Sequence, residues 1–321
     1  MDLMYTNANR VDQGVLTAYA FDLSFGASEN DFEMTLGANE PFLEFGAISY
    51  IEGTEYGGIV DGMKTSTNGE TVTYMGRTFH GIINSKVIEP DPGENYYVVS
   101  GDANEVLALL IDRLGLSGLF VAEEKLAGVN IPGYQFDRYC KGYDGIRAML
   151  ATNGLKLKIS WENRAVHLSA EPIADYTDSP VDGDIASLTV ERHSQKVNHL
   201  VCLGRGELAG REVIHLYADQ FGRIGEVQYY TGLEEVADTY ENSNAESSDD
   251  LRKGGIDRLT ELRNNDKAEI ALLETEGLSY DIGDLVGATE MKSGVSVAAN
   301  VTQKIVKINN GAVRIEYKTG G

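Results

Sequence analysis

The five histidines are the first residues to consider for chemistry, because imidazole serves both as a general base and as a metal ligand. They are His80, His167, His193, His199 and His215. None falls in an H-E-x-x-H pair or in another recognised ligand spacing. His167 and His215 lie in alternating segments and are predicted on strand faces. His193 and His199 flank five residues and could meet across a turn, but a zinc site there lacks a second ligand pair.

The two cysteines, Cys140 and Cys202, lie far apart in the sequence and in no metal-ligand spacing. They form no disulfide framework, and both are predicted to be buried thiols. The cations Arg138 and Lys141 beside Cys140 could lower its pKa, yet the surrounding sequence matches no thiol peptidase signature. A G-x-S-x-G elbow is absent as well. The sequence therefore favours no nucleophilic enzyme.

Acidic pairs and glycine loops give equally weak signals. Glu123-Glu124 and Glu234-Glu235 are adjacent acids, whereas a glycosidase needs two carboxylates that face each other across a cleft. The acid-rich stretch 238–250 follows no EF-hand order and is interpreted as a solvated loop ahead of a helix. Residues 57–65 resemble a phosphate-binding loop with one residue too many, and the glycines of 204–210 have the wrong spacing for a dinucleotide fingerprint. Both are interpreted as β-turns.

The sequence thus predicts no catalytic residue, no cofactor-binding residue, no metal ligand and no cofactor. Its 50 acidic and 27 basic residues give a net charge of −23, which repels phosphate and argues against sequence-specific binding of nucleic acid and against docking on an anionic membrane. The longest strongly apolar run, 106–111, is too short for a membrane span, and no signal peptide is visible. The 36 Gly, 6 Pro and 17 Tyr favour a β-rich chain with many tight turns.

Hydrophobic periodicity divides the first half of the chain into two parts. Residues 1–98 contain β-favouring segments at 15–21, 31–36 and 71–77, with the hairpin signal Asn68-Gly69 ahead of the last. They predict a first β-barrel-like hub domain. Residues 99–180 predict an α+β domain. It contains a helix capped by Asp102 and Glu105, a second helix over 144–152, and a hairpin over 155–168.

The second half predicts a further β-domain interrupted by a helical insertion. A linker over 177–184 precedes strands at 185–190, 200–203 and 213–217. A helix that begins at Ser247 or Ser248 falls in the insertion, 233–265. Strands return at 269–273, 295–297, 301–308 and 312–317, and the turn Asn309-Asn310-Gly311 joins the last two. Residues 181–232 and 266–321 are therefore the second β-barrel-like hub domain. The predicted fold class is mainly β with α+β inserts: two small antiparallel β-barrel-like modules plus a helix-hairpin domain and a helical insertion.

Several short motifs, taken in order, resemble segments of known tail-hub proteins. Residues 72–83 contain a strand ending in Gly76-Arg77, followed by the "K-x-I-x-P" piece at 86–90. Residues 198–206 resemble the "N-x-x-V-x-x-G-x-G" strand, and 217–222 resemble the hairpin that follows it. Residues 280–286 resemble the "Y-x-x-G-D-x-V" motif of hub and baseplate modules. The chain therefore resembles the siphovirus tail-hub family, the N-terminal platform of tail-associated lysins, and the myovirus baseplate hub.

The resemblance implies a virion structural protein of a phage or prophage tail. Such a hub is expected to be a homotrimer whose six β-modules form a ring, joining the tail tube to a tip spike, fibre or lysin. The implied partners are the tail tube or distal tail protein, the tape-measure protein, and the tip spike or receptor-binding protein. The implied location is the virion tail, after assembly in the bacterial cytoplasm.

The resemblance also leaves two alternative functions open. Some relatives carry a peptidoglycan hydrolase downstream of this fold, but the chain is expected to end just after its last hairpin, at Gly321, and so not to be an enzyme. A tail-associated cell-wall hydrolase is nevertheless one alternative. The other is a carbohydrate- or receptor-binding module at the tail tip, in which Tyr229 and Tyr230 could stack on sugars.

Overall fold

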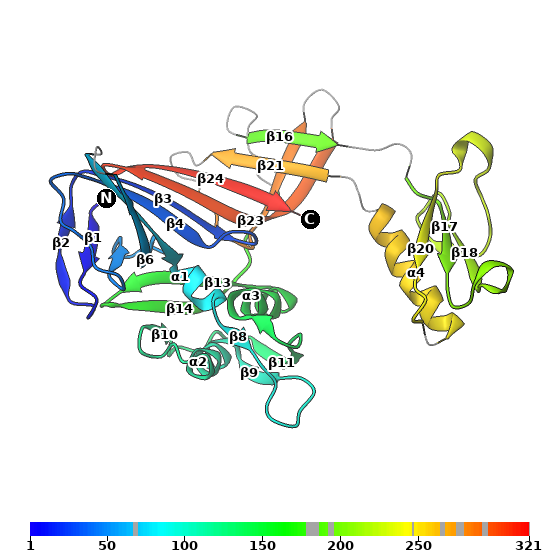
Figure 1. The fold of residues 1–321 in the computed structure, drawn as a ribbon, viewed down its shortest axis with the longest axis horizontal. Helices are drawn as coiled ribbons and strands as arrows, with labels where there is room; N and C mark the ends of the chain where they lie inside the picture. Colours follow the sequence, from blue (N-terminus) through cyan, green and yellow to red (C-terminus); the bar gives the residue numbers. More distant parts are fainter. Residues whose placement is uncertain are drawn as a thin grey trace. The chain divides into compact units, whose positions relative to one another are not determined.

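The computed structural model describes residues 1–66, 70–177, 186–191, 196–245, 247–263, 267–273, 279–290 and 295–320. The chain forms two compact units, one of residues 1–188 and 269–321 and the other of residues 189–268. The first unit is built mainly from strands, as the glycine and tyrosine content predicts, and the second combines strands with one long helix (Figure 1). The predicted Asn68-Gly69 turn, and the predicted linker from residue 178 on, lie outside the described residues.

A large sheet is the main element of the first unit, and strands from both ends of the chain contribute to it. Along its path the order is β16-β21-β24-β23-β3-β4-β7-β6-β5-β1-β2, while β22 pairs with β15 and β23. The N-terminal strands are β1 (Leu3–Thr6), β2 (Asp12–Leu16), β3 (Tyr19–Gly26), β4 (Asp31–Gly37), β5 (Ile48–Tyr50), β6 (Gly57–Thr65) and β7 (Thr71–Thr78). The others are β15 (Asp175–Tyr176), β16 (Ala186–Glu191), β21 (Lys267–Leu273), β22 (Leu285–Glu290), β23 (Val295–Asn309) and β24 (Ala312–Gly320).

The pairing of β3 with β23 joins the two ends of the chain in one sheet. Phe21 lies opposite Ile308 on one side and opposite Met34 of β4 on the other. Alternate β3 side chains point into the core, where Phe21, Leu23 and Phe25 are buried, as the period of two in a strand requires. The long separation in sequence shows that this core completes only when both ends of the chain are present.

The described strands do not close into barrels, which corrects the prediction of two β-barrel-like modules. The sheet is an open path with β16 and β2 at its ends. The physical reason is that β3 uses its second edge to pair with β23 instead of closing onto a strand of its own module. The two groups of strands therefore share one hydrophobic core, which includes Phe25 from the N-terminal group and Tyr317 from the C-terminal group.

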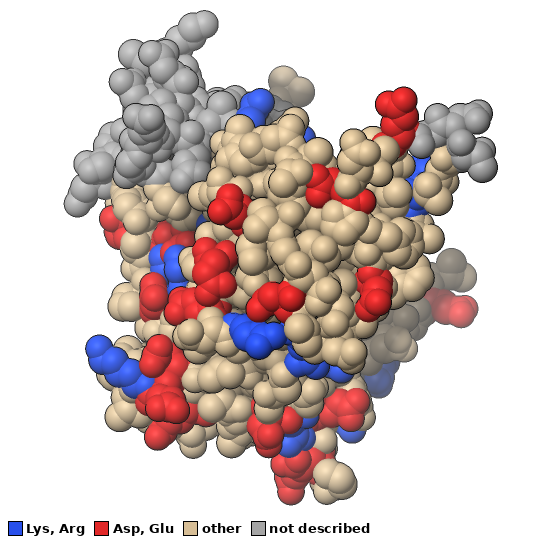
Figure 2. Space-filling model, turned by 90° about the vertical axis from the view of Figure 1, so that its left-hand side faces the viewer, with Lys and Arg blue, Asp and Glu red and all other residues tan. Residues whose placement is uncertain are grey.

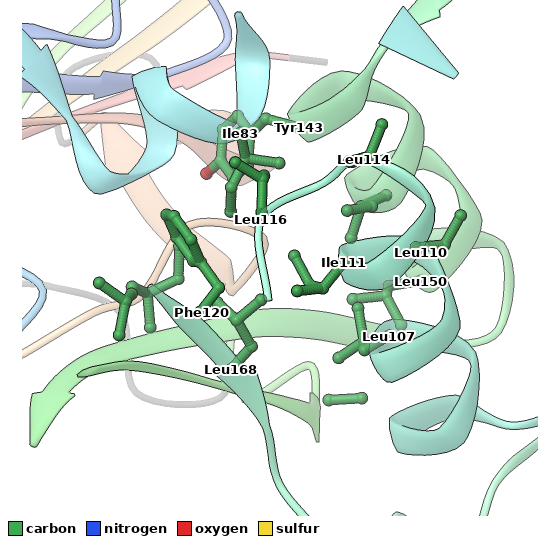
Figure 3. Close-up of a cluster of buried hydrophobic side chains, with 14 of the residues drawn as sticks. Ile83, Leu107, Leu110, Ile111, Leu114, Leu116, Phe120, Tyr143, Leu150 and Leu168 are labelled. Atoms are coloured by element: carbon green, nitrogen blue, oxygen red, sulfur yellow. The ribbon is translucent and has the colours of Figure 1, made fainter. Parts of the chain in front are cut away.

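Three helices and seven short strands lie on one side of this sheet (Figure 1). Asp102 caps α2 (Ala103–Arg113) as predicted, because its carboxylate accepts a hydrogen bond from the backbone N–H of Asn104 at 3.0 Å. Buried apolar side chains from the helices and from the β10 and β14 strands pack together beneath the sheet (Figure 3). The elements are α1 (Phe79–Asn84), α2 (Ala103–Arg113), α3 (Gly142–Thr152), β8 (Val87–Ile88), β9 (Val98–Asp102), β10 (Phe120–Ala122), β11 (Asn130–Gln135), β12 (Cys140–Lys141), β13 (Leu155–Glu162) and β14 (Ala165–Pro172).

Trp161 connects this helical part to the large sheet. It is the single tryptophan of the chain and is 1% exposed. Its ring stacks on Tyr50 of β5 and on Phe79 of α1, with centroid distances of 4.4 and 5.5 Å. Its fluorescence should therefore report the unfolding of the first unit alone.

The second unit is a four-stranded sheet in the order β19-β18-β17-β20, with one helix packed on a face. Gly255 lets this helix approach β17 closely, since a Cβ there would lie 2.4 Å from the Cys202 sulfur. The elements are β17 (His199–Leu203), β18 (Val213–Ala218), β19 (Ile224–Gly225), β20 (Ala237–Glu241) and α4 (Ser248–Arg263), with single 3-10 turns at Leu208–Gly210 and Gly232–Glu234.

The second unit begins before the predicted insertion, 233–265. Strands β17 and β18 were expected to belong to the second β-domain, 181–232 with 266–321. They pair with each other and with β20 instead, and all three strands belong to the second unit, residues 189–268. Among the described residues, no helix is long and apolar enough to cross a membrane.

Candidate functional site

The two cysteines are not activated nucleophiles. Cys140 is half-buried, and burial together with the nearby Asp137 carboxylate raises the pKa of its thiol. The cations beside it in sequence do not reverse that effect. Cys202 is fully buried, and burial raises the pKa of its thiol too. Both cysteines are therefore thiols at neutral pH, whereas a nucleophile has to be a thiolate.

The two glycine-rich stretches are structural. Residues 57–65 form β6, a strand inside the large sheet, so their interpretation as a β-turn was wrong. Gly58 is needed there for close strand contact, because a Cβ would lie 2.2 Å from the Arg77 carbonyl oxygen. The stretch 204–210 does connect two strands, β17 and β18, and Gly206 adopts a positive φ of 97°. That interpretation as a turn is confirmed.

The histidines fall in three different environments, and His193 lies outside the described residues. His80 is buried in α1, and His167 lies on β14. His199 and His215 lie on neighbouring strands of the second unit, with Glu235 beside them. Within the part of the chain that the structure describes, no three His, Cys, Asp or Glu side chains gather in a way that could hold a metal ion.

The most unusual group of side chains is a buried ionic network in the first unit, here called the charged junction. Burying a charge is costly unless it is paired, so such a network marks a place where the fold is tightly specified. It brings together the β5–β6 loop, α1, β13, β23 and the loop before β22. Its members are Glu55, His80, Lys156, Lys158, Asp281, Asp284 and Lys304.

Lys304 and Glu55 form the innermost pair of the charged junction. The Lys304 ammonium nitrogen lies 2.6 Å from Glu55 Oε1, and its side chain is only 2% exposed. Glu55 Oε2 lies 3.3 Å from His80 Nε2. Burial lowers the pKa of His80 despite this carboxylate, so His80 is neutral at pH 7 and its Nε2–H donates to Glu55. The pair thus ties β23 to the β5–β6 loop and to α1.

Asp284 organises the second half of the junction and is 1% exposed. Its carboxylate accepts bonds from the Lys156 ammonium at 2.7 and 2.9 Å. It also accepts from the backbone N–H groups of Asp281, at 2.8 Å, and Ala174, at 2.9 Å. Asp281 in turn lies 2.9 Å from both Lys156 and Lys158, and 3.6 Å from Lys304. One loop therefore ties β13 to β23.

This loop is the "Y-x-x-G-D-x-V" motif that the sequence singles out. Tyr280 and Val286 are buried in the core, and Gly283 takes a positive φ of 104° that lets the loop turn. The Asp of the motif is Asp284. The motif is visible in the sequence, but its partners on β13 are not, because the alternation of residues 155–161 predicts a strand without showing what its lysines face.

The electrostatics of the junction favour permanent charges over proton transfer. Burial alone would raise the pKa of Glu55, but Lys304 and the His80 hydrogen bond lower it to about 2. Burial would lower the pKa of Lys304, but Glu55 raises it well above its usual value. The pKa of Asp281, which burial would raise, is held below its usual value mainly by Lys304. None of these groups is poised near neutral pH, as a general acid or base should be.

A small cavity of about 150 Å³ opens beside the junction and is lined by Glu55, Lys158, Asp281 and Lys304 among others. A larger one of about 290 Å³ lies between α3, β13 and Gly283. Ligand sites for drug-sized molecules are typically about 300–1,000 Å³, so the cavity beside the junction is well below that range and the larger one lies at its lower limit. The charged junction is therefore best understood as a structural connection.

The low pKa of Glu55 makes stability depend on pH. Its carboxyl has an ordinary value of 4.5 and a folded value of about 2, so the junction's contribution is fully present above pH 4.5 and is lost as the pH falls toward 2. We expect the urea midpoint of the first unit, followed by Trp161 fluorescence, to fall between pH 6 and pH 3. In Glu55→Gln the drop should be clearly smaller. An equal drop in both proteins would contradict this assignment.

Comparison with known proteins identifies the fold. No protein-family model matches the chain, and no curated protein matches it in sequence. Among solved structures, a 43 kDa tail protein of the prophage MuSo2 from Shewanella oneidensis is similar, with a TM-score of 0.52 and 12% identity over 100% of this chain and 98% of that one. A chain of the phage P2 baseplate, in its activated conformation with Ca, has a TM-score of 0.52 and 10% identity over 100% and 99% of the two chains.

A prophage tail protein from Listeria monocytogenes is also similar, with a TM-score of 0.51 and 12% identity over 99% of this chain and 94% of that one. The chain thus has the fold of phage tail and baseplate proteins, as the ordered motifs implied. The likeness extends from one end of the chain to the other in each case.

Proposed function

We propose that this chain is the structural hub of a phage or phage-derived tail, and that it is not an enzyme. The observation that carries the proposal is the likeness, over the whole of both chains, to phage tail and baseplate proteins. Within the described residues, burial raises the pKa of both the Cys140 and the Cys202 thiol, Glu55 and Lys304 form a buried ion pair, and the buried His80 is neutral, so none of these groups is an activated nucleophile or base.

In this proposal three copies form a ring that joins the tail tube to a tip spike, fibre or lysin. Its partners are the tail tube or distal tail protein, the tape-measure protein, and the spike or receptor-binding protein. Each copy supplies two β-rich modules, residues 1–98 and the strands of 181–232 and 266–321 that lie in the large sheet, while 99–180 supports them. The β3–β23 pairing supports this role, because it holds the two modules in a fixed relation within one copy.

The acidity of the chain also suits a conduit for DNA. A ring through which DNA passes should not hold on to phosphate, and the net charge of −23 favours repulsion. On the face shown in Figure 2, acidic side chains are scattered among uncharged ones. The virion tail is the location that follows from the proposal, with assembly in the bacterial cytoplasm.

The proposal predicts a trimer. Light scattering coupled to size exclusion should give about three times the monomer mass of 34.9 kDa, either for the chain alone or after it is mixed with the tail tube protein of the same particle. Electron micrographs of that sample should show rings with threefold symmetry. A protein that stays monomeric in both samples contradicts the ring.

A zone of lysis in a peptidoglycan gel, lost on a Cys140→Ser or Glu→Gln change, would instead support the hydrolase alternative.

A further inference from the structure

Two histidines and a glutamate form a compact cluster on the exposed face of the second unit. His199 of β17 and His215 of β18 are diagonal neighbours, because His199 lies opposite Tyr217 and Val201 lies opposite His215. Their side chains point away from the hydrophobic core that β17 and β18 form with α4, to which Leu200, Cys202 and Leu216 contribute. The cluster therefore plays no part in that core.

One ring nitrogen of each histidine lies beside the other ring, and the second nitrogen of His199 lies beside Glu235. His199 Nε2 lies 2.8 Å from His215 Nδ1, and His199 Nδ1 lies 2.6 Å from Glu235 Oε1. An ionised carboxylate only accepts hydrogen bonds, so His199 Nδ1 carries the proton and donates it to Glu235. In neutral His199 the lone pair is therefore on Nε2 and is directed at His215.

The surroundings hold His199 in this orientation. Its ring stacks on Tyr217 with a centroid distance of 4.4 Å, and its side chain is only 12% exposed. Gln228 donates to the same Glu235 oxygen at 3.2 Å. A carboxylate that fixes the tautomer of an imidazole in this way is the arrangement that commonly stands behind a metal-ligating histidine.

We propose that His199 Nε2 and His215 Nδ1 form a binding site for one divalent transition-metal ion of the kind that imidazole prefers, such as Zn²⁺. Glu235 is a positioning residue and does not touch the metal. The two remaining positions of a tetrahedral ion would be filled by water in the isolated chain. The acidic net charge of the protein favours the approach of a cation.

The rearrangement needed for binding is small. In the absence of metal, His215 Nδ1–H donates to the lone pair on His199 Nε2. When the proton of His215 moves from its Nδ1 to its own Nε2, the lone pair on Nδ1 becomes available to the metal. Neither ring changes its charge. Two nitrogens bound to one tetrahedral zinc ion lie about 3.3 Å apart, so the pair has to open by roughly half an ångström. His215 is exposed, and its side chain is free to make this movement.

Calorimetric titration of the full chain with ZnCl₂ at pH 7.5 tests the proposal. We expect one zinc ion per chain, loss of that binding in His215→Gln, and a roughly 10–100-fold weaker affinity in Glu235→Gln. His167→Gln is the matched control, since this histidine also lies on a strand face but in the other unit, and it should bind zinc like the unchanged protein.

A second readout keeps the test independent of the heat signal. Replacing ZnCl₂ by CoCl₂ should produce visible absorption bands that reach a maximum at one equivalent and are absent in His215→Gln. Circular dichroism should show that each variant remains folded, because none of the three changed side chains is buried. The proposal is overturned if the unchanged chain binds no metal, or if His215→Gln binds zinc with unchanged affinity.

Discussion

Replacing Lys304 by methionine is expected to lower the free energy of unfolding of the first unit by about 3–5 kcal/mol. The change removes the ammonium that lies 2.6 Å from Glu55 and 3.6 Å from Asp281, and so leaves a buried carboxylate without its cation. Urea denaturation followed by the fluorescence of Trp161 measures the loss, because that residue is buried where the large sheet meets α1.

Two further variants separate the loss of charge pairing from the loss of packing. Lys158→Met is the matched control, because Lys158 also binds Asp281 but its side chain is 41% exposed. We expect it to cost less than about 1 kcal/mol. The double change Lys304→Met with Glu55→Gln removes both partners and should recover most of the lost stability. If the double variant is no more stable than Lys304→Met, the ion pair is not the cause.

The second large effect is expected for Gly76→Ala, which should destabilise the first unit by about 3 kcal/mol or more. A Cβ at this position would lie 1.9 Å from the Ile59 carbonyl oxygen and 2.8 Å from the Phe32 ring. The first of these atoms belongs to the backbone of β6, inside the sheet, so relief of the contact requires the two strands to separate.

Gly62→Ala supplies the matched control for this change. Gly62 belongs to the same β6–β7 pair, opposite Met75, but the nearest atom to a Cβ there is the end of the Met75 side chain at 3.8 Å. This variant should be close to neutral in the same denaturation experiment. Equal stability of the two variants would show that strand separation at Gly76 costs little.

Gly76 and Arg77, the "G-R" pair of the sequence motif, both act where β7 pairs with β6. The register of β6 against β7 shifts between Val60 and Gly62, and Asp61 lies at this bulge. The Asp61 carboxylate accepts two bonds from the Arg77 guanidinium, at 2.7 and 2.8 Å. The glycine permits the close strand contact and the arginine binds the bulge, so the two residues act together in one piece of local structure.

Local features of the fold were predictable because they depend on neighbouring residues. The cap at Asp102 and the periodic apolar residues after it predict α2, which begins at Ala103. The Asn309-Asn310-Gly311 turn predicts the β23–β24 hairpin, and Asn310 and Gly311 have the positive φ values, 46° and 86°, that such a turn needs.

Long-range features were not predictable, for an equally physical reason. A period of two shows which side chains of β3 point inward, but not that β23 is its partner. For the same reason nothing in the sequence indicates that Lys304 faces Glu55, or that His199 and His215 meet. These contacts depend on strand order and register, which single-strand patterns leave open. The prediction of two β-barrel-like modules was wrong for the same reason, because strand order decides whether a sheet closes.

The β3–β23 pairing also sets the order of events during protein synthesis. Strand β3 ends at Gly26, and the strand that covers its second edge ends at Asn309. Ribosomes add about 5–20 residues per second. The second edge of β3 therefore remains unpaired with β23 for at least about 14 seconds after β3 has been synthesised. During that time an exposed strand edge can pair with another chain. The nascent protein is therefore most vulnerable to aggregation before its C-terminal strands emerge, and a chaperone that shields the N-terminal strands would raise the yield of folded protein.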